Sequence, residues 1–143
     1  MTYGGLKRQI IFHRIKDVNS FIYNDVTARF ILKANALPLV LNVVEKTGSY
    51  VVEEREKDSE TYYFTTISAV VSNVSKINSS MLSELKKEEW FVIIETLTGS
   101  KKVVGTNEVP CKIIIKERVT ADHSFNGYDL SVECNSVLPP LFL

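Results

Sequence analysis

The run Trp90-Phe91-Val92-Ile93-Ile94 is apolar at every position. Successive side chains of a strand point to opposite faces of its sheet. Apolar residues here occupy both parities, with Trp90, Val92 and Ile94 on one face and Phe91, Ile93 and Leu97 on the other. A strand that is apolar on both faces must be covered on both, so we expect this one in the middle of the fold.

The residues after the central run predict further strands. The turn signal Leu97-Thr98-Gly99-Ser100 leads into a short return arm, residues 101–105. Apolar and polar residues then alternate along residues 111–116, and a polar connection covers residues 117–125. The strict alternation of residues 128–135 is typical of a half-buried strand.

The first half of the chain is also rich in strand patterns. Aromatic and β-branched residues favour strands at residues 9–15, 27–33 and 61–72. Residues 39–46 and 50–56 predict a hairpin about Thr47-Gly48-Ser49, in which Gly48 would supply a positive φ. Residues 17–25 are polar enough to form a loop or a distorted turn.

One segment predicts a helix, which starts near Asn78-Ser79-Ser80 and runs to Glu88. Serine and asparagine are good caps, and Met81, Leu82 and Leu85 would share one face. A helix of about two turns is marginal alone, so we expect it to pack on the sheet. The chain is therefore expected to be a β-rich α+β domain: a curved antiparallel sheet, or a partly closed β-barrel or sandwich, with one short helix. Residues 1–143 would form a single domain with an apolar C-terminal arm at about residues 137–143.

Composition argues against several classes of partner. The 17 basic residues balance the 17 acidic ones, so no overall field attracts nucleic acid or an anionic membrane. Lys7, Arg8 and Arg14 near Phe12 are the nearest approach to a nucleic-acid pattern. No apolar run approaches the ~20 residues of a membrane span. We expect no nucleic-acid specificity, no membrane partner, and folding in a reducing cytoplasm.

The sequence contains no recognisable constellation for catalysis. Cys111 and Cys134 are too far apart for a metal motif, and we expect both to be reduced and buried, with thiols that could lie close. His13 lies inside a strand pattern. His123 follows Asp122 directly, and adjacent residues cannot form a catalytic triad, which is a spatial arrangement across separate elements. We therefore predict no enzyme activity, no catalytic or metal-binding residue and no cofactor.

Two segments remain as candidate contacts between subunits. The run of residues 53–60 carries seven charges in eight positions and predicts a solvated loop. The C-terminal tail, residues 137–143, is apolar to its end, which is unusual for a terminus. It could close the chain's own sheet as a last strand, or dock as an arm on a neighbouring subunit. The candidate contact residues are Glu54, Arg55, Glu56, Leu138, Pro139, Pro140, Leu141, Phe142 and Leu143.

The order of signals from residue 61 onward resembles a family of small proteins encoded in bacteriophage and prophage structural-gene clusters. In that pattern an aromatic strand leads to a short polar helix and then to a hydrophobic strand with a hairpin. A Gly-x-x-x-x-Pro corner follows, here Gly105 to Pro110, and then a strand that begins Asn126-Gly127-Tyr128. The chain closes on a proline and an aromatic residue, here Pro139 and Phe142. The resemblance covers a little over half of the chain and does not extend to residues 1–60.

The resemblance implies a virion structural protein of the neck or tail: a head–tail connector, a tail-tube subunit or a tail-completion factor. Such a homo-oligomer would form a ring or tube with copies of itself, bind other virion proteins, and assemble in the host cytoplasm. It implies no catalytic residues. The alternative is a monomeric protein-binding module or immunity-like inhibitor, with the aromatic strand around Tyr62-Tyr63-Phe64 as its contact face.

Overall fold

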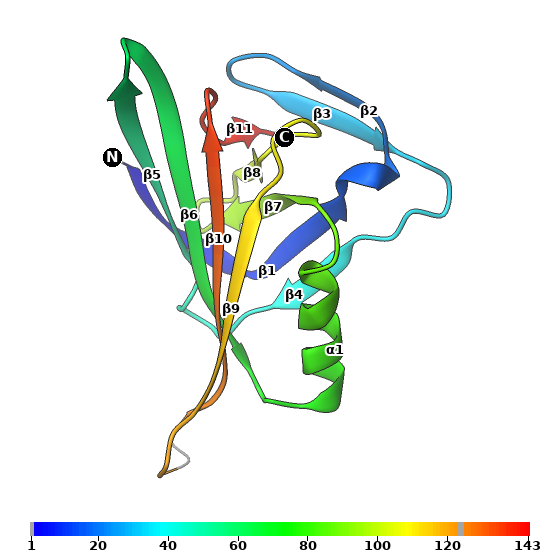
Figure 1. Ribbon diagram of the computed structural model, residues 1–143, viewed down its shortest axis with the longest axis vertical. Helices are drawn as coiled ribbons and strands as arrows, with labels where there is room; N and C mark the ends of the chain where they lie inside the picture. Colours follow the sequence, from blue (N-terminus) through cyan, green and yellow to red (C-terminus); the bar gives the residue numbers. More distant parts are fainter. Residues whose placement is uncertain (1, 123–124) are drawn as a thin grey trace.

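The computed structural model describes residues 2–122 and 125–143, and it consists mainly of antiparallel strands beside one helix (Figure 1). The strands are β1 (Thr2–Arg14), β2 (Val18–Tyr23), β3 (Ala28–Leu32), β4 (Leu39–Asn42), β5 (Ser49–Lys57), β6 (Glu60–Ser72), β7 (Trp90–Thr96), β8 (Lys101–Val104), β9 (Lys112–Val119), β10 (Asn126–Ser136) and β11 (Leu141–Phe142). Helix α1 (Lys76–Leu85) lies between β6 and β7 in the sequence, and a 3-10 turn, η1 (Ile15–Asp17), follows β1. The predicted β-rich α+β class is confirmed.

A nine-stranded sheet forms the body of the molecule, in the order β11-β8-β7-β1-β5-β6-β10-β9, with β4 also paired to β1. Strand β1 pairs with β7 along one edge, and its register shifts between Leu6 and Ile10. It changes direction in the middle, so the sheet curves around a core (Figure 1). An isolated antiparallel bridge joins Trp90, at the start of β7, to Cys111, the residue before β9. The sheet is thus curved but not closed, which agrees with the predicted curved sheet.

Strand β7 is buried on both faces, as its sequence predicts. Trp90, Val92 and Ile94 belong to the first core, which the curved sheet and α1 enclose. Phe91 and Ile93 belong to the second core, on the opposite face. That face is covered by a separate two-stranded unit formed by β2 and β3, here called the ribbon. The prediction for Leu97 is wrong: it lies in the turn after β7 and is 68% exposed.

Helix α1 begins and ends earlier than predicted. Ser75 is its N-cap, and the Ser75 side chain accepts a hydrogen bond from the Asn78 backbone N–H at 3.2 Å. Leu82 and Leu85 are buried in the first core, as expected. The Trp90 Nε1–H donates to the Leu85 carbonyl at 3.0 Å. The cap at Ser75 was missed because the run of serines and asparagines offers several capping residues.

The hairpin predicted about Gly48 is wrong. Strands β4 and β5 do not pair with each other, because both lie along the same edge of β1: β4 beside residues 9–12 and β5 beside residues 2–5. The residue with positive φ is Lys46 (64°), and Gly48 is outside that region. A Cβ at position 48 would lie 3.1 Å from the Leu6 Cβ. Gly48 therefore allows a close approach to β1 rather than a reversal of the chain.

Three other segments predicted as loops are partly strands. Residues 18–23 form β2 instead of a loop, because Phe21 pairs with Phe30 across the ribbon and packs on the second core. The charged run continues as the outer half of the β5–β6 hairpin and turns only at Asp58 and Ser59, both with positive φ. Strand β9 continues to Val119, three residues into the predicted polar connection.

Candidate functional site

The C-terminal tail forms the last strand of the chain's own sheet. In β11, Leu141 pairs with Val103 and Phe142 with Lys102 of β8. Leu141 is only 2% exposed and belongs to the second core, against which Leu138 also packs. Of the two alternatives left open by the sequence, closure of the chain's own sheet is therefore seen for residues 141–142.

The tail also fastens the ribbon to the main sheet. The Phe142 backbone N–H donates to the Val26 carbonyl at 2.8 Å, and Thr27 and Phe142 form a parallel bridge. The Leu143 N–H donates to the Lys101 carbonyl at 3.0 Å. β11 thus lies between β8 and the segment that joins β2 to β3, so the tail connects the two layers.

The outer side of the same contact is apolar and exposed. Val26 is 58% exposed, Phe142 43% and Leu143 51%. We call these three residues the tail patch; the backbone hydrogen bond from Phe142 to Val26 joins the two segments that carry them. The Lys102 ammonium lies 4.9 Å from the centre of the Phe142 ring. Pro139 and Pro140 are half-buried. In the tail, Leu141 is therefore buried in the second core, whereas Phe142 and Leu143 are exposed at the surface.

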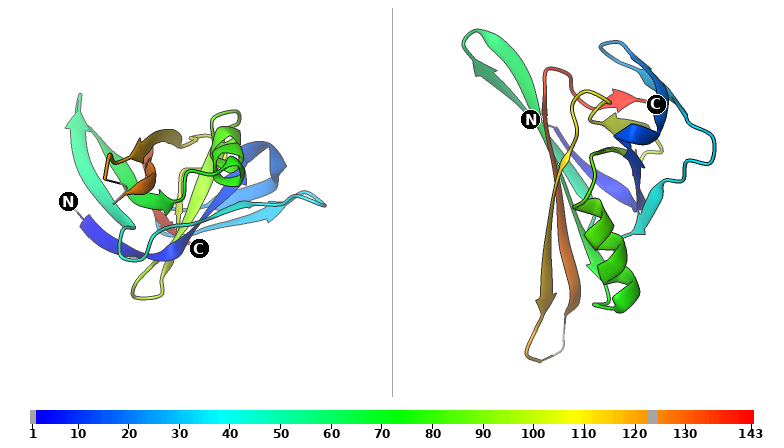
Figure 2. Two further views of the ribbon diagram at one scale, coloured as in Figure 1. Left: turned by 90° about the horizontal axis from the view of Figure 1, so that it is seen from below. Right: turned by 45° about the vertical axis from the view of Figure 1, so that its right-hand side comes forward.

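The charged segment forms a projecting hairpin. Among the described residues, the pairing of β1 with β5 ends at Val52, and residues 53–57 pair only with β6. Glu54, Arg55 and Glu56 are exposed. Arg55 donates to Glu53 at 2.8 Å, a contact that lowers the pKa of Glu53, and its guanidinium lies 4.6 Å from the centre of the Phe64 ring. The hairpin tip and the C-terminus lie apart in Figures 1 and 2, so the structure does not bring the two candidate segments together.

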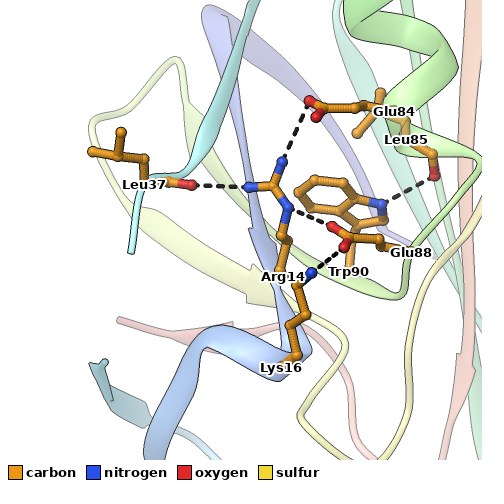
Figure 3. A network of polar contacts seen from close by, with 7 residues as sticks. All are labelled: Arg14, Lys16, Leu37, Glu84, Leu85, Glu88 and Trp90. Atoms are coloured by element: carbon orange, nitrogen blue, oxygen red, sulfur yellow. Dashed lines mark hydrogen bonds and ion pairs between the residues drawn. The ribbon is translucent and has the colours of Figure 1, made fainter. Parts of the chain in front are cut away.

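A polar network that the sequence did not predict joins the end of β1 to the end of α1 (Figure 3). The Arg14 guanidinium donates to the Glu88 carboxylate, to Glu84 at 3.3 Å and to the Leu37 carbonyl at 3.1 Å. It also lies over the Trp90 ring, 4.6 Å from the ring centre. Lys16 donates to the other oxygen of Glu88; this hydrogen bond, aided by Arg14, lowers the pKa of Glu88. Arg14, one of the three basic residues that came nearest to a nucleic-acid pattern in the sequence, thus contacts carboxylates and an indole ring.

The second core contains a buried histidine. His13 is 8% exposed and stacks on Phe91, with ring centres 5.3 Å apart, and it meets the edge of Phe30 at 5.0 Å. Burial lowers the pKa of His13, and nearby Asp17 acts in the opposite direction. His123, the other histidine, lies outside the described residues.

The two cysteines are free and buried, as predicted. The Cys111 thiol donates to the Val104 carbonyl at 3.2 Å. The neighbouring Cys134 and burial together raise the pKa of Cys111, so its thiol stays protonated. Both residues belong to the first core.

Within residues 2–122 and 125–143, no group of three or more His, Cys, Asp or Glu side chains is arranged to hold a metal ion. In that same part of the chain, no helix has the length and apolar character needed to cross a membrane. Comparison with protein-family models, with curated proteins and with solved structures finds no match to this chain.

Proposed function

We propose that this chain is a structural subunit of a phage-type neck or tail, which acts by self-assembly and by binding neighbouring virion proteins. The order of sequence signals from residue 61 onward supports the phage context. The structural observation that carries the assembly role is the tail patch. Apolar groups exposed at a surface can mark interaction sites, and Val26, Phe142 and Leu143 are exposed on two segments that a backbone hydrogen bond joins.

The shape of the molecule supports the same role. The β5–β6 and β9–β10 hairpins extend from the body in opposite directions (Figure 1). Extensions of this kind give a subunit additional surface for contacts with neighbouring molecules. Contacts between different surfaces of successive copies generate rings or tubes.

The tail patch can be tested without disturbing the core, because Phe142 and Leu143 are exposed whereas Leu141 is buried. The test compares the wild type with a Phe142→Ser/Leu143→Ser variant by light scattering across a hundredfold range of concentration. We expect the wild type to form concentration-dependent oligomers, visible as rings or tubes by negative-stain electron microscopy. The variant should remain folded and need at least tenfold more protein to assemble.

Ile77→Ser is the matched control, since Ile77 is 74% exposed on α1, away from the tail. It should assemble as the wild type does. A wild type that stays monomeric at all concentrations would contradict self-assembly and favour the monomeric binding module. A virion role further predicts that the neighbouring genes encode head and tail proteins.

A further inference from the structure

The sheet ends at β9, and the outer edge of this strand is open. Among the described residues, β9 pairs with β10 alone, from Lys112 opposite Glu133 to Val119 opposite Asn126. The backbone N–H and C=O groups on the other side of an edge strand are free to pair with a strand from another chain. β9 therefore presents an unpaired edge eight residues long.

This edge borders a groove. Helix α1 runs alongside the β9–β10 hairpin in Figures 1 and 2. A cavity of about 290 Å³ lies between them, lined by Leu82, Ser83 and Lys86 from α1 and by Ile115 and Glu117 from β9, with Ser79 and Tyr128 completing it. An extended peptide that pairs with a strand edge beside a helix gains main-chain hydrogen bonds, and side pockets read its alternate side chains.

The two faces of β9 differ in chemistry. Ile113 and Ile115 point inward and pack against the first core. Lys112, Lys116 and Arg118 share the outward face and are exposed. On the paired side, Lys112 lies opposite Glu133 and Lys116 opposite Asp129, so β10 already places carboxylates beside these cations. A strand with the same alternation of acidic and apolar residues would suit the open edge.

Charge argues against a second copy of this chain as the occupant. Two β9 strands could pair antiparallel so that their outward faces lie on the same side of the joint sheet. The cations of both copies would then lie opposite each other, which is destabilising. Within the part of the chain that the structure describes, residues 53–57 of β5 are a second open edge. Glu54 and Glu56 lie on the same face of β5 as the buried Tyr50 and Val52, which is the inward face. Paired with β9, these carboxylates would face Ile113 and Ile115, and inward charges of this kind protect an edge from pairing.

We infer that the open edge of β9, beside α1, binds an extended segment of a different protein in which acidic residues alternate with apolar ones. The acidic side chains would meet Lys112 and Lys116 on the outward face, and the apolar ones would enter the groove next to Ile115 and Leu82. The inference rests on the proposed function, and it names the surface that would receive a neighbouring virion protein.

A synthetic peptide, acetyl-(Glu-Val)₄-amide, is the probe, and acetyl-(Lys-Val)₄-amide is its charge-reversed counterpart. Binding is measured by calorimetry, and the site is located by hydrogen exchange of the β9 amides. We expect the Glu-Val peptide to bind and protect residues 112–119, and the Lys-Val peptide to bind at least tenfold more weakly. Lys112→Glu/Lys116→Glu should reverse this preference.

Lys57→Glu is the control for charge reversal away from β9, because it replaces one exposed lysine by glutamate on the β5–β6 hairpin. It should bind the Glu-Val peptide as the wild type does. Lys112→Gln/Lys116→Gln removes the charge without adding repulsion to β10, and it should also weaken binding of the Glu-Val peptide. That variant keeps the test decisive if the charge reversal prevents folding.

Equal binding of both peptides, or unchanged binding by the Gln variant, would overturn the inference. The inference would also be overturned if the amides of residues 112–119 became protected from exchange when the protein concentration is raised without peptide. That result would mean that a second copy occupies the edge. Light scattering on the same samples separates the two proposals. Assembly without peptide binding contradicts only the β9 site, whereas peptide binding by a strict monomer supports the site and contradicts self-assembly.

Discussion

His13 links the stability of the second core to pH, because its imidazole packs against the rings of Phe91 and Phe30. Burial favours the neutral form and lowers the pKa of His13 from its usual 6.5, although Asp17 partly opposes this. Below pH 6.5 the unfolded chain binds a proton that the folded chain does not. The free energy of unfolding must therefore fall as the pH drops from 6.5 through the folded-state pKa.

We predict that urea unfolding of the wild type shows this loss between pH 7.5 and 5, and that His13→Gln removes most of the slope. The comparison uses the dependence on pH rather than the absolute stability, since the substitution itself disturbs the stacking. An equal slope in both proteins would mean that other groups account for the dependence.

Two glycines, Gly105 and Gly127, are required by the backbone. Gly105 has a φ of 85°, and a Cβ there would lie 2.9 Å from the Val109 carbonyl oxygen. A Cβ at Gly127 would collide with the Val71 carbonyl in the neighbouring strand β6. In both places the residue type follows from geometry, since only glycine tolerates such an approach without strain.

At the scale of elements, the Arg14 network fixes the end of β1 against the end of α1. A short helix gains its stability from tertiary contacts, and Arg14 binds Glu84 in α1 and Glu88 just after it. Arg14 also contacts the Leu37 carbonyl and the face of Trp90, and so joins the helix end to other elements. The planar guanidinium can serve all four at once, which an ammonium group cannot.

We predict that Arg14→Lys lowers the free energy of unfolding by about 1 kcal/mol or more, mainly through loss of the contact with the indole ring. Lys16→Gln is the control, because the Lys16 side chain is 66% exposed and exposed ion pairs contribute little. Urea unfolding at neutral pH measures both. A cost for Lys16→Gln equal to that for Arg14→Lys would contradict this account.

At the scale of the whole molecule, the chain has two cores that share β7 and β1. The first is enclosed by the curved sheet and α1, and the second is the smaller one, covered by the ribbon and completed by the tail. Leu138 and Leu141 are the tail's contribution to the second core. The two cores should therefore differ in stability, and the tail should control only one of them.

We predict that a chain ending at Val137 remains folded around the first core but opens its ribbon. In hydrogen exchange, amides of β2 and β3 should exchange much faster than in the full chain, while those of β6 and β10 should keep their protection. Complete unfolding of the truncated chain, or an unchanged ribbon, would contradict this division.

Much of the strand content follows from local patterns. The doubly apolar run of β7 and the alternation of β10 predict their burial, because neighbouring side chains alone reveal which faces need cover. The error at residues 39–56 has a different origin. A glycine between two apolar runs suggests that the runs pair with each other in a hairpin. Here both runs, β4 and β5, pair with β1 instead.

The candidate contacts divide in the same way. An apolar terminus indicates that the tail packs against protein, but the sequence of the tail does not tell whether that protein is the same chain or a neighbouring subunit. The fold assigns Leu141 to the second core and leaves Phe142 and Leu143 exposed. The Arg14 network was missed because its members come from β1, the loop before β4 and the end of α1, and no local pattern connects them.

Local sequence patterns suffice to predict a β-rich chain with one short helix, a central strand covered on both faces and two buried cysteines. These properties depend on the periodicity and polarity of neighbouring residues. Long-range contacts set which strands share an edge, leave β9 unpaired on its outer side among the described residues, and pair the tail with its own sheet. Those choices depend on contacts between residues far apart in the chain, which form only when the whole sheet curves around its core.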